Sequence, residues 1–171
     1  MEHRPKITIR PNRADKVVEG LSYAFLAATF VQALYAYFTL PDTVPVHFNI
    51  KGEADGYGSK ISILPLPLIS VISFVGMTIL NRYPWIFNYP VKITPENALK
   101  QYTSAVRLIR WLKLSVLLIF FLITAGMSYS AREGSFIMGT LMLPLILVIA
   151  TLPLLIYLIE AFRKPQKPLK S

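Results

Sequence analysis

The run GLSYAFLAATFVQALYAYFTL, residues 20–40, decides the fold class of this chain. It is predominantly apolar, and no Asp, Glu, Lys, Arg or His interrupts it. A helix that rises about 1.5 Å per residue needs about 20 residues to cross the hydrocarbon core of a bilayer. A surface helix of a soluble protein would instead carry a polar stripe at every third or fourth position. We therefore predict that residues 20–40 span a membrane.

Three further runs have a similar length and character: residues 61–80, 114–131 and 136–159. The whole chain is 54% hydrophobic and 16% charged, whereas about a quarter of the residues of a soluble domain are charged. Arg132 and Glu133 would be costly at mid-bilayer, so they predict a turn between the third and fourth runs. The sequence thus predicts an all-α membrane protein, a single integral membrane domain of 171 residues with four transmembrane helices.

The basic residues predict the orientation of these helices. Fifteen of the 18 Lys and Arg residues lie in the segments 1–19, 81–113 and 160–171. Segments rich in Lys and Arg stay cytoplasmic, so we predict a cytoplasmic arm, a cytoplasmic loop with a helix, and a cytoplasmic tail, with residues 41–60 outside. Both termini are then cytoplasmic in a multi-pass protein of the plasma membrane. The net charge of +9 reflects this bias, so we expect the lipid bilayer, and no nucleic acid, as its partner.

The middle cytoplasmic segment carries a helix start. Thr94 is a suitable N-cap, and Pro95 suits the first helical position. We predict a cytoplasmic interfacial helix that lies partly on the membrane and continues into the third span. Its apolar face is Ala98, Tyr102, Ala105, Ile109 and Leu112, and its other faces carry Lys100, Arg107, Arg110 and Lys113.

The outer segment VPVHFNIKGEADGYGSK, residues 44–60, is polar and patterned between two apolar runs. Apolar side chains alternate with others over residues 44–49, which predicts a short extended segment with His47 and Asn49 on one face. The glycines of Lys51-Gly52 and Asp55-Gly56 predict turns. We expect a compact extracytoplasmic loop folded against the outer ends of the spans.

Three interpretations of the polar residues in this loop remain open. In the first, His47, Glu53 and Asp55 bind a divalent metal. In the second, His47 is a general base that Asp55 or Glu53 orients, although no recognisable motif supplies a nucleophile. In the third, His47, Asn49 and Asp55 bond the backbone and keep the loop folded.

The stretch LPDTVPVHFNIKGEADGYGSK resembles the signature loop of a bacterial membrane family of unknown function. This domain forms the N-terminal half of SdpI-type immunity proteins, and the resemblance covers roughly residues 20–80. It implies a bacterial inner membrane protein. SdpI-type proteins protect cells from a secreted peptide toxin and take part in membrane signalling. The matching residues are Pro41, Val44, Pro45, His47, Phe48, Asn49, Gly52, Asp55 and Gly56.

Taken together, these features predict a non-enzymatic membrane protein whose outer loop recognises a toxic peptide or an envelope component, without a metal or cofactor. A structural or accessory subunit beside another membrane protein and a metal-dependent membrane enzyme are the alternatives. The lack of ionisable groups within the spans argues against a transporter. Small residues at Gly20, Ala24 and Ala28 permit close helix packing, including an oligomer. The candidate site residues are His47, Asn49, Gly52, Glu53, Asp55 and Gly56.

Overall fold

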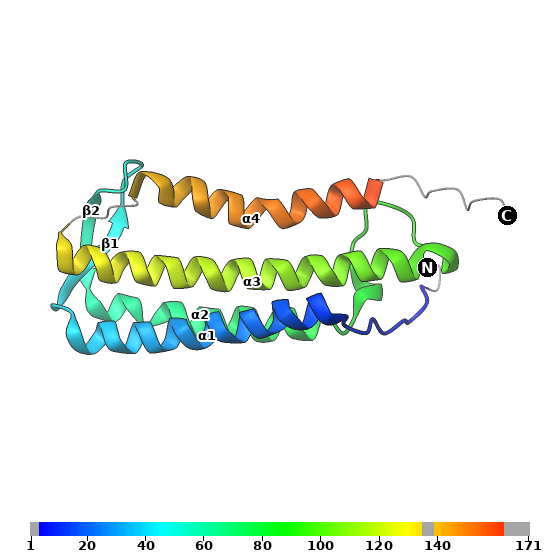
Figure 1. Cartoon of the computed structure of the whole chain (residues 1–171), viewed down its shortest axis with the longest axis horizontal. Helices are drawn as coiled ribbons and strands as arrows, with labels where there is room; N and C mark the ends of the chain where they lie inside the picture. The colour runs from blue at the N-terminus through cyan, green and yellow to red at the C-terminus, as the bar shows by residue number, and fades with distance from the viewer. Residues whose placement is uncertain (1–3, 135–138, 163–171) are drawn as a thin grey trace.

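The computed structural model describes residues 4–134 and 139–162. Within this part of the chain, four helices are long and apolar enough to cross a membrane. They contain α1 (Arg13–Thr39), α2 (Pro65–Leu80), α3 (Pro95–Glu133) and α4 (Gly139–Phe162). The second span, Lys60–Leu80, joins α2 to the short 3-10 helix η1 (Lys60–Ile63) that precedes it. The helices run side by side, and α3 contacts the other three (Figure 1). The prediction of an all-α membrane protein with four spanning helices is confirmed, with one small hairpin as its only sheet in the described residues.

Helix α1 begins well before the apolar run. Asn12 caps it: the Asn12 side chain accepts from the backbone N–H of Asp15 at 2.8 Å, and the Asp15 carboxylate accepts from the N–H of Asn12 at 2.8 Å. This capping box satisfies two otherwise unpaired donors of the first turn. Residues 13–19, at the end of the predicted cytoplasmic arm, are therefore helical. Apolarity alone cannot locate a helix start that is made of polar residues.

Helix α3 runs without a break from Pro95 to Glu133, which confirms the predicted helix that continues into the third span. The N–H of Thr94 donates to the side-chain oxygen of Asn97 at 2.9 Å. At the other end Gly134 adopts a left-handed φ of 69°, a common way to end a helix. Arg132 lies in the last turn of α3 and not in a loop, and its guanidinium donates to Thr39 Oγ1 at 2.9 Å.

The N-terminal arm packs on the middle loop. Arg4 donates from Nη1 to the backbone oxygens of Trp85 and Phe87 at 3.2 and 2.7 Å. Ile7 and Ile9 pack against a buried cluster that includes Tyr102. The arm is therefore fixed to the loop between α2 and α3 by both polar and apolar contacts.

Residues 41–60 form an antiparallel hairpin of strands β1 (Thr43–Phe48) and β2 (Ala54–Ser59). It lies at the opposite end of the bundle from the start of α1 and the end of α4 (Figure 1). Val44 is fully buried in a cluster with residues of α1 and α3, including Ala36 and Met127. The expected compact loop, folded against the helix ends, is thus present.

The simple alternation predicted for residues 44–49 fails at the middle of β1. Pro45 is buried and Val46 is 40% exposed. The register shifts between Pro45 and His47, and again before Phe48. Such irregularities break the period of two that a regular strand would show. Asn49 lies beyond the strand, in the turn.

The last predicted span, residues 136–159, is represented by α4. Residues 136–138 lie outside the described part of the chain. Pro144 and Pro153 both lie inside α4. Most side chains of α4 are not covered by the rest of the protein. Only 6% of the residues in its most apolar 18-residue stretch are buried.

Candidate functional site

The tip of the hairpin is organised by Asn49. Its side-chain oxygen accepts from the backbone N–H groups of Lys51 and Glu53 at 2.9 and 3.0 Å. Its amide nitrogen donates to the Glu53 carboxylate at 2.8 Å. Gly52 has a φ of 76° and donates its N–H to the Asn49 carbonyl at 2.8 Å. Gly52 therefore makes the predicted turn, because glycine alone adopts this backbone without a Cβ penalty.

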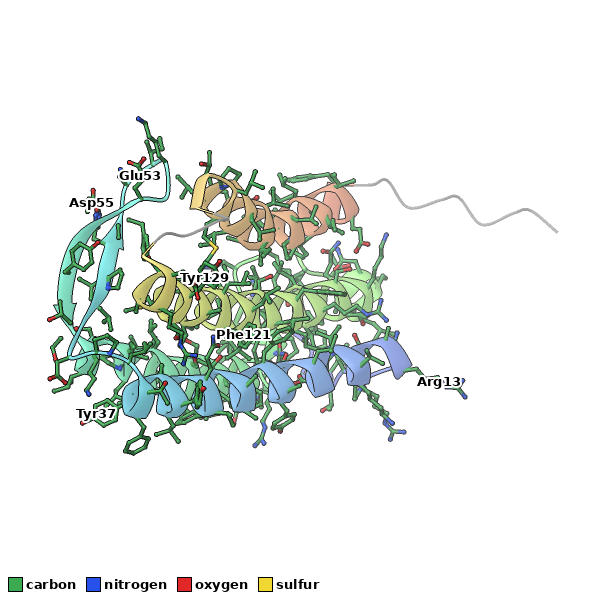
Figure 2. All side chains as sticks on the ribbon, turned by 60° about the vertical axis from the view of Figure 1, so that its left-hand side comes forward. Arg13, Tyr37, Glu53, Asp55, Phe121 and Tyr129 are labelled. Carbon is green, nitrogen blue, oxygen red and sulfur yellow. The ribbon has the colours of Figure 1, made fainter. Side chains whose placement is uncertain are left out.

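His47 and Asp55 face each other across the two strands. Nδ1 of the imidazole lies 2.5 Å from an oxygen of the Asp55 carboxylate. The side chains are 71% and 44% exposed, respectively. Figure 2 labels Asp55 and Glu53 at this end of the molecule. An exposed pair of this kind contributes little to folding stability, but it fixes the direction in which the imidazole ring points.

Gly56 lies inside β2 and not in a turn, so the turn predicted for Asp55-Gly56 was wrong. It is paired with His47 in the hairpin. A Cβ added at Gly56 would lie 2.8 Å from the Cβ of His47, closer than two carbons can approach. The glycine is therefore required by the close approach of the strands.

The metal site of the first interpretation is not assembled. Glu53 bonds Asn49, while Asp55 bonds His47, so the three proposed ligands do not converge. Over residues 4–134 and 139–162, no group of three or more His, Cys, Asp or Glu side chains is placed to hold a metal ion. The metal-dependent enzyme is thus not supported. Of the three residues in the third interpretation, Asn49 bonds the loop backbone as expected, whereas His47 and Asp55 bond each other.

An apolar groove of about 440 Å³ lies under the hairpin, between it and helices α3 and α4. The Thr140 hydroxyl donates to the carbonyl of Lys51 at 3.0 Å and so ties the hairpin tip to α4. Polar groups reach the groove from His47 and Asn49. Its apolar lining includes Phe48, Ile50, Ile123, Met142 and Ile146. Sequence analysis missed this groove, because it forms between segments far apart along the chain.

A cluster of charges at the opposite end of the bundle was also missed. Lys113 is fully buried, and its ammonium lies 2.5 Å from the Glu19 carboxylate and 3.0 Å from the Thr78 hydroxyl. Arg110 lies 3.4 Å from Asp15. Arg110 and Lys113 were predicted on the faces of the helix other than the apolar one, and the structure turns both of them toward α1. Asp15 and Glu19 are four residues apart and therefore lie on one face of a helix. This spacing is the feature of the sequence that could have indicated the cluster.

Comparisons with known proteins agree with this architecture. Residues 24–71 match a family described as a domain of unknown function, DUF1648. The match covers most of α1, the hairpin and the start of α2. An uncharacterized protein of Archaeoglobus fulgidus is 29% identical over 155 residues, which are 86% of this chain and 79% of that protein. No solved structure matches the chain.

These findings describe a multi-pass membrane protein that is similar to proteins of unknown function. The similar protein is archaeal. The bacterial source and the resemblance to SdpI-type immunity proteins therefore stay predictions.

Proposed function

We propose that this protein is a non-enzymatic binding protein of the plasma membrane, which recognises an amphipathic peptide at the outer surface. The hairpin and the groove beneath it form the binding site. The observation that carries the proposal is the apolar groove bordered by His47 and Asn49. Its volume of about 440 Å³ falls within the range of roughly 300–1,000 Å³ that is usual for ligand sites.

The chemistry of the site suits a basic peptide with an apolar face. Apolar side chains of the peptide enter the groove, where Phe48 and Ile50 are available from the hairpin. The carboxylates of Glu53 and Asp55 lie beside it on exposed residues. Membrane-active peptides combine these features, with Lys and Arg on one face and large apolar residues on the other. The immunity role implied by the sequence resemblance requires the same recognition.

The proposed orientation places the hairpin outside a bacterial cell and both termini in the cytosol. It is supported by the basic residues at the opposite end of the bundle, since positively charged segments are retained inside. A peptide that arrives from outside would then meet the hairpin first.

Photo-crosslinking in intact cells tests the proposal. A benzoylphenylalanine at Ile50, which lines the groove and is 79% exposed, is irradiated while the cells are treated with a basic amphipathic peptide. We expect an adduct with the mass of the peptide. The matched control is benzoylphenylalanine at Tyr57 on β2, which is 63% exposed and outside the groove. Equal yields from the two positions, or no adduct from Ile50, would contradict the proposal.

A second pair of variants separates the groove from the surface of the hairpin. Met142→Trp places a larger side chain in the groove, whereas Leu147→Trp makes the same kind of change on the exposed part of α4. We expect the first variant to reduce the adduct about tenfold, the equivalent of roughly 1.4 kcal/mol. The second should leave it unchanged. An adduct made only of phospholipid would instead favour an envelope lipid as the ligand.

The exposed apolar surface of α4 favours a second candidate, a structural or accessory subunit that packs beside another membrane protein. Benzoylphenylalanine at Leu154, which is 44% exposed on α4, distinguishes it. A discrete protein adduct at this position, with none of peptide mass from Ile50, would support the accessory role.

A further inference from the structure

A second groove, of about 260 Å³, lies between α3 and α4 at the end opposite the hairpin. Leu108 on α3 and Ile156 on α4 give it an apolar lining. Arg107 on α3 and Glu160 on α4 line the same groove and carry opposite charges. The groove is therefore mainly apolar, with one cationic and one anionic side chain.

This groove lies at the level of the inner surface of the membrane. It is lined by Trp111 and Tyr157, aromatic residues of the type that gather at the boundary between headgroups and hydrocarbon. Trp111 lies three residues before the predicted span 114–131, and Glu160 immediately follows the predicted span 136–159. The two charges thus lie near the level of lipid headgroups, and the apolar lining lies beside the chains.

The two charges differ in their contacts. Arg107 lies 3.4 Å from the Asp15 carboxylate through Nε, and its side chain is still 46% exposed. Asp15 holds the guanidinium in place and leaves part of it accessible. In the portion of the chain that the structure describes, no side chain hydrogen-bonds or ion-pairs with Glu160. The groove therefore offers a positioned cation and a carboxylate without a counter-ion from these residues.

We propose that this groove binds a phosphoethanolamine lipid of the inner leaflet. Arg107 binds the phosphate, and the Ser104 hydroxyl donates to it. Glu160 binds the ammonium group, and one acyl chain lies along Leu108 and Ile156. A phosphoglycerol lipid has the phosphate but no ammonium, so it leaves the Glu160 carboxylate unpaired. The proposal depends on the charges of this groove and not on the function proposed for the hairpin.

Fluorescence quenching by brominated lipids tests this inference, because Trp111 lies in the groove. The chain has 2 tryptophans, so Trp85→Phe leaves Trp111 as the single reporter. The full chain is reconstituted in phosphoglycerol vesicles, and dibrominated phosphoethanolamine or dibrominated phosphoglycerol lipid is titrated in. We expect phosphoethanolamine to bind beside Trp111 about three- to tenfold more tightly than phosphoglycerol, as one charge-assisted contact would produce.

Charge variants assign this preference to the two residues. Glu160→Gln should abolish the preference and leave phosphoglycerol binding unchanged or stronger. Arg107→Gln should weaken both lipids, and Arg107→Lys should restore much of the loss because it keeps the charge. Glu133→Gln, which removes the same charge at the other end of the bundle, is the matched control and should change nothing. Trp85 as the single reporter, in a Trp111→Phe variant, should show no headgroup preference.

Two results would overturn the inference. Equal quenching of Trp111 by the two lipids would mean that only ordinary boundary lipid occupies the groove. A preference for phosphoethanolamine that survives Glu160→Gln would mean that the carboxylate does not recognise the headgroup. Neither result depends on whether a peptide binds at the hairpin.

Discussion

Lys113 on α3 and Glu19 on α1 form an ion pair of 2.5 Å at the end of the bundle opposite the hairpin. The lysine side chain is fully buried, and its ammonium also lies 4.5 Å from the centre of the Phe74 ring on α2. Lys113 on α3 thus contacts both α1 and α2. A buried pair of this kind need not add net stability, but it opposes any sliding of one helix past another.

Removing either charge of this pair should destabilise the fold. We expect Glu19→Gln to cost about 3–5 kcal/mol, because the Lys113 ammonium then stays buried without its counter-ion. Lys113→Met should cost less, because Glu19 is 28% exposed and also lies 3.6 Å from Arg110. The double variant should recover most of this loss. Thermal unfolding in detergent, followed by circular dichroism, measures the effect. Lys100→Met, an exposed position on the same helix, is the control. If the stability lost in the double variant equals the sum of the losses in the two single variants, the two side chains do not act as a pair.

Gly56→Ala should disrupt the hairpin. The new methyl group would lie 2.8 Å from the Cβ of His47, and we expect a cost of about 1–3 kcal/mol from the forced movement. Gly20→Ala on α1 is the control, since nothing lies within 4 Å of its added Cβ. Because His47→Ala keeps the Cβ that causes the clash, it should not rescue Gly56→Ala. The measurement is hydrogen exchange of the hairpin amides, and rescue by His47→Ala would refute the steric explanation.

Asn49→Ala should loosen the hairpin tip. The substitution leaves the N–H groups of Lys51 and Glu53 without their acceptor, a loss of roughly 1 kcal/mol for each bond. Exchange of these two amides should accelerate by about tenfold or more. His47→Ala is the comparison, because its pair with Asp55 is exposed and makes no bond to the tip. Similar acceleration in both variants would show that Asn49 has no special role there.

Cysteine labelling tests the orientation of the bundle. The chain has no cysteine, so Lys51→Cys at the hairpin tip and Lys100→Cys on α3 can each be labelled singly. In intact bacterial cells, an impermeant maleimide should label Cys at 51 at once and Cys at 100 only after lysis. The reverse pattern would place the hairpin in the cytosol and remove the proposed route for a peptide from outside.

Much of the architecture could be predicted from local sequence. The four apolar runs predicted the spanning helices, and Thr94-Pro95 predicted the start of α3. The Gly52 turn was also predictable, because the required backbone is a property of one residue. The pairing of β1 with β2 was not, because two irregularities in register hide the alternation. The role of Gly56 follows only from the residue opposite it.

The sequence by itself determined that the chain crosses a membrane and where the apolar segments of its four spanning helices lie. Transfer of a helix into lipid is close to a sum over neighbouring residues, so composition over about 20 positions is enough. The tertiary structure alone decided which polar groups meet. Lys113 and Glu19 are 94 positions apart. The first groove forms between the hairpin, α3 and α4, and the second forms between α3 and α4. Such contacts depend on how the helices pack and turn relative to one another, which local composition does not encode.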